Sequence, residues 1–394
     1  MINLKQVALS SLLVCSITNV YAEANDPIQN IIDNHRQQYQ GKEHFTAIQV
    51  SIKSGDTIKN FVSGKVALGK NQPDLTPEHL FEIGSITKSY TAVLALQAEA
   101  REQLSLQKSL QKYLDQYPQW GHLNLIQLLN MTSGLPNYSD SPTMNMAFVT
   151  SPEHVWSPTE MAALVYKKGF NPPLRTGYDY TNMGYILMDM ILHQQTKLPY
   201  AELLARDIFK PLKLRNTFYP VPAMKDAVKK RLVSGYAFNV YTNPELVGRD
   251  MKNNNLSWGG AAGGIVANSE DVLHWVQALF EEEALLNQAQ KKQMQKLVST
   301  KSGKPVERTD SEDPEGFGLG IVQKYDPNIG RFWFYEGETL GYRSLYMYLP
   351  CNKVIIVALF NSATNSENDH GGLLMTALYH EVPKQHPDLK ACKS

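Results

Sequence analysis

Segments that alternate like β-strands occur near both ends of the 394-residue chain, and segments with helical spacing fill its middle. Residues 47–54 and 57–67 alternate in this way around a Ser-Gly-Asp turn, and they follow a helix-like segment at 27–40. Four further strand-like segments, separated by Gly and Pro, precede a helix-like segment at about 371–382. These four segments are 317–322, 331–336, 342–349 and 353–360.

This order of segments predicts how the chain is divided. Strands from the two ends can share one antiparallel sheet if the helical middle is an insertion between them. We therefore predict an α+β fold, in which an antiparallel sheet is flanked by N- and C-terminal helices and an all-helical subdomain is inserted. Within one domain over 23–394, the α/β part is expected at about 23–100 and 300–394, and the helical part at about 101–299.

The first 22 residues have the composition of a secretory signal peptide. Lys5 supplies a positive charge, residues 7–14 form a short apolar core, and Ala22 is a small residue suited to precede a cleavage site. The core is too short to cross a bilayer comfortably, so no stable membrane span is expected. We predict removal of residues 1–22 and a periplasmic or secreted location. A lipoprotein attached through Cys15 is the alternative, which the bulk of Val14 disfavours.

Charge and motif content exclude several classes of partner. The chain has 38 Lys and Arg residues and 38 Asp and Glu residues, so no excess positive charge would attract nucleic acid or an anionic membrane surface. Neither a Cys-x-x-Cys pair nor a His-Glu-x-x-His motif occurs, so the sequence does not support a metal site. We expect a small molecule or a peptide as the partner.

The strongest chemical signal is a Ser-x-x-Lys sequence at the start of a helix-like run. Residues three apart in a helix lie on one face, so Lys88 can stand over the hydroxyl of Ser85. A serine needs a neighbouring base to act as a nucleophile, and a desolvated lysine loses its charge readily enough to be that base. The alternative is an N-capping serine and a solvated lysine, because Ser-x-x-Lys often occurs by chance.

Two later segments could complete a site. Tyr180 and Asn182 lie on a loop before a helix-like run, where a phenol can relay a proton and a carboxamide can hold a substrate amide. Gly337 follows a strand-like segment, and a backbone N–H there could pair with that of Ser85 as an oxyanion hole. The structural alternatives are packed loop aromatics for the first segment and an ordinary hairpin for the second.

Together these motifs make the sequence resemble the serine β-lactamase and penicillin-recognising peptidase family, which includes class C β-lactamases, D-alanyl-D-alanine carboxypeptidases and related esterases. The likeness covers nearly the whole chain after the predicted signal peptide, including Ala262-Gly263-Gly264 in the Gly-rich run. The family's Ser-x-x-Lys, Tyr-x-Asn and Lys/His-x-Gly motifs fall, in this order, on Ser85 and Lys88, on Tyr180 and Asn182, and on Tyr335-Glu336-Gly337.

The resemblance implies a β-lactamase/transpeptidase-like fold and a substrate that acylates Ser85. Lys88 and Tyr180 would move the proton of that serine, and which of the two is the base stays open. Asn182 would hold the amide on the acyl side, and the N–H groups of Ser85 and Glu338 would form the oxyanion hole. Water would then release the acyl group. No metal and no organic cofactor are implied.

Two residues depart from the family pattern. Tyr335 replaces the expected Lys or His, and its phenol carries no positive charge at neutral pH. Glu336 stands where β-lactamases and many carboxypeptidases have Thr. Its carboxylate would repel the free carboxylate of a penicillin or of a D-alanine terminus, unless Arg343 offsets it at the substrate. Both departures weaken the expectation of strong lactamase activity.

The leading functional prediction is an exported serine hydrolase of the D-alanyl-D-alanine carboxypeptidase type. A class C-like β-lactamase comes second. An esterase, or an aminopeptidase in which Glu336 binds the ammonium group of a D-residue, comes third. The chain could also be a non-catalytic binder of cell-wall peptides, which the complete motif set argues against. Covalent labelling by a penicillin or a fluorophosphonate would separate the enzymes from the binder, because only an activated serine forms the adduct.

Two cysteines remain beyond the predicted signal peptide. Cys351 lies in the turn that opens the last strand-like segment, and Cys392 lies near the C-terminus. If the final helix packs antiparallel on the sheet, its end returns toward the start of that strand, and the short tail can bring the two cysteines together. Export favours a disulfide between them. Two unpaired thiols are the alternative.

Overall fold

The computed structural model describes residues 19–21, 26–169, 172–386, 389 and 392. The predicted signal peptide lies outside the described residues except for residues 19–21, which form strand β1 (Asn19–Tyr21). This strand pairs in parallel with β3, whereas all other neighbours in the main sheet are antiparallel.

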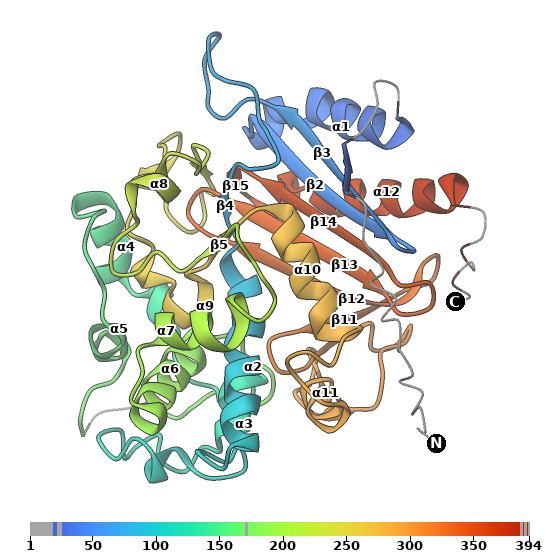
Figure 1. Cartoon of the computed structure of the whole chain (residues 1–394). Coiled ribbons are helices and arrows are strands. Elements are labelled where there is room, and N and C mark those ends of the chain that lie inside the picture. Colours follow the sequence, from blue (N-terminus) through green and yellow to red (C-terminus); the bar gives the residue numbers. More distant parts are fainter. Residues whose placement is uncertain (1–18, 22–25, 170–171, 387–388, 390–391, 393–394) are drawn as a thin grey trace, which may run out of the picture.

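The main sheet is built from both ends of the chain, as the order of segments predicts (Figure 1). The two ends of the chain meet at the antiparallel pair β2 and β14, in which Val50 stands opposite Ala358. Among the described residues the sheet has ten strands. From one edge to the other they are β1, β3 (Thr57–Gly64), β2 (Ala47–Ser54), β14 (Val354–Phe360), β13 (Arg343–Leu349), β12 (Gly330–Glu338), β11 (Val322–Asp326), β10 (Glu315–Phe317), β8 (Leu297–Ser299) and β9 (Pro305–Val306).

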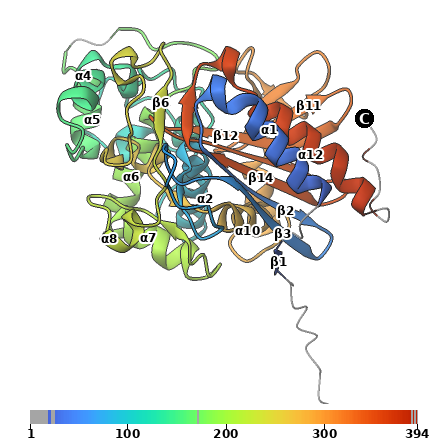
Figure 2. The ribbon, with the colours of Figure 1, turned by 90° about the horizontal axis from the view of Figure 1, so that it is seen from above.

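Helices cover both faces of this sheet. Helices α1 (Pro27–Glu43) and α12 (Gly371–Gln385) lie side by side on one face, and α10 (Ser269–Phe280) packs on the other (Figures 1 and 2). Strand β14 contributes side chains to the cores on both faces of the sheet, because successive side chains of a strand point to opposite sides. Ile355 and Val357 belong to the core shared with α10. Ile356 and Ala358 belong to the core under α1 and α12.

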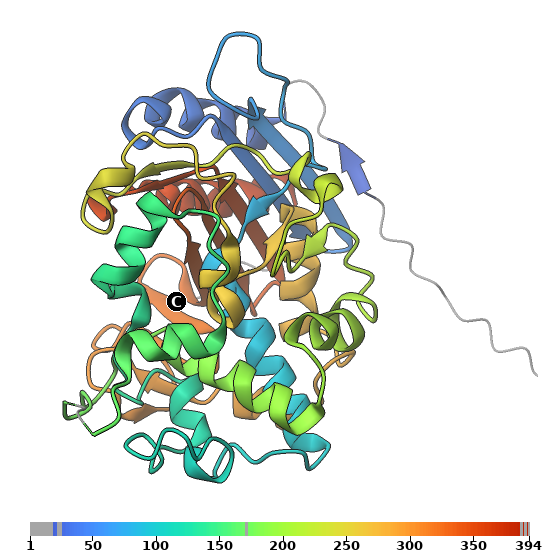
Figure 3. The same cartoon turned by 90° about the vertical axis from the view of Figure 1, so that its left-hand side faces the viewer.

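A largely helical part stands beside the sheet, and Figure 3 shows it from its outer side. Helix α2 (Thr87–Ala100) enters it after the short strand β4 (Phe81–Glu82) and one helical turn, and nearly all of α2 is buried. The other α-helices are α3 (Leu125–Leu129), α4 (Pro142–Thr150), α5 (Pro158–Val165), α6 (Met183–Thr196), α7 (Tyr200–Leu204), α8 (Asp226–Lys229), α9 (Gly260–Gly263) and α11 (Gln288–Met294).

Short elements connect the two parts. Strand β4 pairs with β7 (Val266–Ala267), which also pairs with β5 (Thr217–Phe218), and β15 (Ser362–Thr364) pairs with β6 (Tyr236–Phe238). The remaining helical turns are η1 (Gly84–Ile86), η2 (Leu110–Lys112), η3 (Tyr138–Asp140), η4 (Ala205–Phe209), η5 (Pro244–Leu246), η6 (Leu256–Trp258) and η7 (Ser366–Asn368).

The α+β fold with an inserted helical part is therefore confirmed, and two details of the sequence-based division differ. The strand predicted at 317–322 is wrong. Residues 318–321 form a turn between β10 and β11, in which Gly318 donates to the carbonyl of Ile321 and Gly320 has a φ of +68°. Helix α10, which the sequence places in the helical part, packs on β2 and β14 of the sheet.

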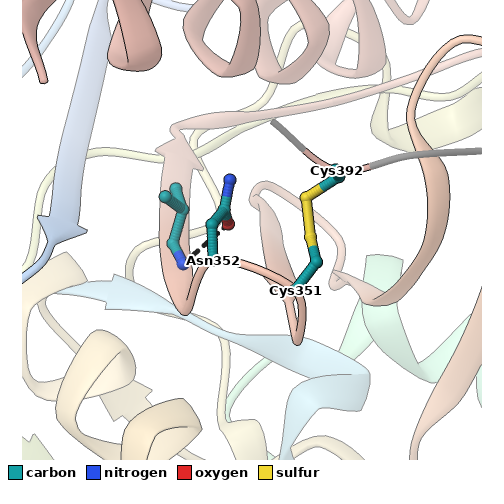
Figure 4. The surroundings of a disulfide bond; sticks show 4 residues. Cys351, Asn352 and Cys392 are labelled. Carbon is teal, nitrogen blue, oxygen red and sulfur yellow. Dashed lines mark hydrogen bonds between the residues drawn. A yellow bond between two sulfur atoms is a disulfide. The ribbon is translucent and has the colours of Figure 1, made fainter. Parts of the chain in front are cut away.

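A disulfide joins Cys351 to Cys392, with the two Cα atoms 5.6 Å apart. Figure 4 shows the bond between the turn before β14 and the segment after α12. Helix α12 runs back along the sheet and so returns the chain to this turn, which is the path that the sequence suggests. No helix among the described residues is long and apolar enough to cross a membrane.

Candidate active site

The nucleophile candidate lies where the sheet part meets the helical part. Ser85 is the central residue of η1, which joins β4 to α2, and its side chain is half-buried. Gly84 just before it has a φ of +48°, and a Cβ there would lie 2.7 Å from the backbone nitrogen of Glu338. Only glycine fits this conformation and this close approach, so Gly84 lets the turn lie against the end of β12.

Lys88 stands one turn along the helix and points its amine at the serine. Its Nζ donates to Ser85 Oγ at 2.8 Å and to the carbonyl of Ala262 at 2.9 Å. The side chain is 0% exposed. Burial lowers the pKa of Lys88, although the nearby Tyr180 partly opposes this shift. A lysine held in this way can exist as the neutral amine and accept the proton of Ser85.

Tyr180 also contacts the hydroxyl of Ser85. Its Oη donates to Ser85 Oγ at 2.7 Å and lies 3.4 Å from the Oη of Tyr335. Burial of the hydroxyl opposes ionisation, but the charge of Lys88 and hydrogen bonds to Lys88 and Ser85 outweigh it and lower the pKa of Tyr180. We call Ser85, Lys88 and Tyr180 the nucleophile corner. Their hydrogen bonds form a continuous path for a proton.

The end of β12 packs directly against the backbone turn that carries Ser85, because Gly337 has no side chain. A Cβ on Gly337 would lie 2.0 Å from the carbonyl of Ile83 and 2.9 Å from the backbone nitrogen of Ser85. Gly84 and Gly337 thus bring the backbone nitrogens of Ser85 and Glu338, the two groups predicted for an oxyanion hole, to one junction.

A cavity of about 770 Å³ opens over Ser85. This size is within the range of small-molecule sites. Asn182 lies on its wall and donates from its amide nitrogen to Ser139 Oγ at 3.1 Å. The charged residues that line the cavity are Asp140, Glu315, Lys324, Glu336 and Glu338. Acidic groups therefore outnumber basic ones, and Nζ of Lys324 already lies 3.2 Å from a Glu315 oxygen.

Glu336 and Glu338 lie on β12 beside the nucleophile corner, and we call this pair the carboxylate wall. Both side chains are exposed to the cavity. Desolvation by the surrounding protein raises the pKa of Glu336 to about 7, and the negative charges of Asp369 and Glu338 contribute to this shift. The pKa of Glu338 is also raised to about 7, chiefly by desolvation, while a 3.1 Å hydrogen bond from Asn239 opposes the shift.

Arg343 does not lie at the cavity, which corrects its placement among the substrate-binding residues. The side chain is 0% exposed and forms ion pairs with Glu43 at 2.7 Å and Asp369 at 2.6 Å. It points from β13 toward α1 and the start of α12, because a buried guanidinium needs carboxylate partners. Its charge lowers the pKa of Glu336 only in part, and it pairs with Asp369, which is hydrogen-bonded to Glu336.

The structure adds groups that the motifs do not reveal. The carbonyl of Ala262 holds Lys88, and the only signal for it in the sequence is the Gly-rich run, which permits close backbone approach. Phe317 lines the cavity and packs edge-on to Tyr180 and Tyr335, with ring centroids 6.4 and 5.8 Å apart. No cluster of His, Cys, Asp and Glu suited to a metal ion occurs among the described residues.

The chain and its fold are similar to those of known proteins. A sequence model of the Beta-lactamase family matches residues 32–378. A penicillin-binding protein of Bacillus subtilis (strain 168) is 22% identical over 89% of this chain and 76% of its own length. A D-aminopeptidase of Brucella canis is 23% identical over 84% of this chain, which spans 58% of that protein. A D-amino acid amidase of Ochrobactrum anthropi SV3, solved with D-phenylalanine, superposes with a TM-score of 0.74 and 20% identity, covering 91% of this chain and 98% of its own.

Proposed function

The chain belongs to the Beta-lactamase family of serine hydrolases, and on this premise we propose that it cleaves amide or ester bonds through an acyl-enzyme on Ser85. The observation that supports this step is the nucleophile corner. Ser85 Oγ lies within 2.8 Å of Lys88 Nζ and 2.7 Å of Tyr180 Oη, so its proton has two acceptors in reach.

The proposed reaction has two halves. In the first, Ser85 Oγ attacks the carbonyl carbon, its proton passes to Lys88 or Tyr180, and that proton then goes to the leaving amine or alcohol. The backbone N–H groups of Ser85 and Glu338 stabilise the negative charge that forms on the carbonyl oxygen. In the second, water attacks the ester carbonyl, the acid leaves, and Ser85 regains its proton.

We propose that the preferred substrate carries an ammonium group near the scissile bond. The observation that carries this proposal is the carboxylate wall, which places Glu336 and Glu338 at the cavity beside Ser85. An ammonium group bound there would draw both carboxyl groups into their charged forms, whereas a free substrate carboxylate would be repelled. The names D-aminopeptidase and D-amino acid amidase among the similar proteins agree with this class of substrate.

A matched set of substrates tests the proposal. D-alanine p-nitroanilide, its N-acetyl derivative, an acetylated D-Ala-D-Ala peptide and nitrocefin would be compared by kcat/KM on the same preparation. We expect the free amine to be cleaved at least about tenfold faster than its acetylated form. One charge pair in such a site is worth about 1–4 kcal/mol, and about 1.4 kcal/mol corresponds to a factor of ten. Faster cleavage of the acetylated D-Ala-D-Ala peptide than of the free amine would contradict the proposal.

A D-alanyl-D-alanine carboxypeptidase is the second candidate. Lys324 favours it, because its ammonium group lines the cavity and could bind a terminal carboxylate if Glu315 released it. The same set of substrates decides between the two, since a carboxypeptidase needs the free carboxylate and an aminopeptidase the free amine.

We also propose that the protein is exported and loses residues 1–22. The proposal rests on the composition of this segment and on the Cys351–Cys392 disulfide, a bond typical of oxidising compartments. Cleavage after Ala22 would also remove strand β1. N-terminal sequencing of the protein from a periplasmic or culture fraction should begin at Glu23, and an intact Met1 in that fraction would refute the cleavage.

A further inference from the structure

A second cavity, of about 490 Å³, lies within the helical part. It shares no lining residue with the cavity over Ser85. The segment 257–260 separates the two: Trp258 lines the first cavity, while Ser257 and Gly260 line the second. The second cavity opens at the surface beside exposed lining residues such as Thr159 and His193.

Asp189 supplies a carboxyl group to this otherwise largely apolar space. It lies on α6, lines the cavity and is 9% exposed. Within the described part of the chain, no hydrogen bond or ion pair holds this carboxyl group. Burial raises the pKa of Asp189 to about 7, and the nearby His193 opposes the shift only in part. A buried acid without a partner is costly to ionise. The carboxylate form of Asp189 therefore lacks a group that would compensate its charge.

Aromatic rings surround the same space. Tyr200 and Tyr219 line it with their ring centroids 5.0 Å apart, and Trp156 lines it as well. The hydroxyl of Tyr200 is bonded to Thr91 Oγ1 at 2.6 Å, so this ring is fixed in place. The carboxyl group of Asp189 is close enough to both tyrosines to oppose their ionisation. Aromatic faces together with one carboxylate are the combination that binds organic cations.

We propose that this cavity, built around Asp189, Tyr200 and Tyr219, is a second ligand site that takes a small organic ammonium ion with an apolar substituent. The cation would supply the missing partner of Asp189, and Met161 and Met190 would pack against the substituent. The cavity is large enough for a drug-sized ligand. The inference does not depend on Ser85 or on the reaction proposed for it.

Calorimetric titration of the full chain with benzyltrimethylammonium chloride tests the site, because this cation keeps its charge at every pH. Asp189→Asn, a nearly isosteric change, should weaken binding at least about tenfold. Glu202→Gln is the matched control: it removes an exposed acid on α7 that lines neither cavity, and it should leave the affinity within about twofold. Benzyl alcohol, a neutral probe with the same ring, should bind at least about tenfold more weakly than the cation.

Several results would overturn the proposal. No heat of binding to the wild-type chain at millimolar probe would mean that the cavity holds only water. Unchanged affinity in Asp189→Asn would place the cation elsewhere. Loss of affinity in Glu336→Gln alone would place it at the carboxylate wall of the first cavity. If Asp189→Asn does not fold, Thr159→Trp at the exposed mouth replaces it, and unchanged affinity in that variant would equally refute the site.

Discussion

The nucleophile corner and the carboxylate wall face the same cavity, but they are built on opposite physical principles. The corner is built around a buried amine, since Lys88 is 0% exposed and hydrogen-bonded to Ser85 and Ala262. The wall lines the cavity and holds two acids, Glu336 and Glu338. The first arrangement governs whether a serine can react, and the second governs which substrates approach it.

This difference arises because the family's third motif lacks its basic residue in this chain. Tyr335 replaces a basic residue, its hydroxyl lies 3.4 Å from that of Tyr180, and burial raises its pKa well above the ordinary range. It is therefore a neutral part of the corner. Arg343, the compensating cation that the sequence suggested, is paired with Glu43 and Asp369 inside the protein. The wall therefore stays acidic.

The largest effect should come from removing the nucleophile. Ser85→Ala should lower kcat/KM by about 10⁴-fold or more on every substrate, because the remaining groups act only together with the serine. Steady-state kinetics and fluorophosphonate labelling measure the loss. A variant that kept most of its activity would show that the corner is not the reactive site.

The next effect concerns stability rather than catalysis. Arg343→Ala leaves Glu43 and Asp369 without their buried partner and should lower the free energy of unfolding by about 3–5 kcal/mol. Arg308, an exposed arginine, is the control, and its replacement by Ala should change stability by less than about 0.5 kcal/mol. Chemical denaturation measures both. A stable Arg343→Ala protein with weakened substrate binding would mean that Arg343 acts on the substrate.

The two proton carriers should each have a smaller effect than the serine. Lys88→Ala and Tyr180→Phe should each lower kcat/KM by at least about 10²-fold, the usual worth of general acid–base help. Tyr178→Phe is the matched control, since Tyr178 lines the same cavity and its hydroxyl is not in the proton path to Ser85. Single-turnover acylation rates separate the two residues: the base is the one whose loss slows acylation more.

Changing the wall should alter selectivity and leave reactivity nearly intact. Glu336→Thr should lower kcat/KM for a free-amine substrate about fivefold to tenfold and raise the rate of acylation by benzylpenicillin by a similar factor. A neutral ester, p-nitrophenyl acetate, should change less than about twofold because it carries no charge. Equal changes for all three substrates would mean that Glu336 acts on the corner itself.

The smallest effect is a dependence on pH. The pKa of Glu336 is raised to about 7, so its carboxylate and its attraction for an ammonium group grow as the pH rises through 7. The substrate α-amino group loses its charge above about pH 8. The ratio of kcat/KM for the free amine to kcat/KM for the neutral ester should therefore peak between these values. A ratio that does not vary with pH would mean that no titrating carboxyl group contacts the amine.

The sequence by itself determined the nucleophile corner and the class of fold. Ser85 and Lys88 meet because residues three apart share one face of a helix, and alternating strands at both ends of the chain require a common sheet. Tyr180 and Asn182 could be identified because their motif is local. The Cys351–Cys392 pair could be inferred because a helix that runs back along a sheet returns the chain to the start of the strand.

Only the tertiary structure decided the rest, because it depends on contacts between residues far apart in the chain. The direction of Arg343 was set by Glu43, which lies 300 residues earlier, and no local pattern reveals that pairing. The turn at 318–321 replaced a predicted strand because Gly318 and Gly320 favour turning over pairing. The isolation of Asp189 in a second cavity likewise came from the packing of helices, since burial without a partner cannot be read from sequence spacing.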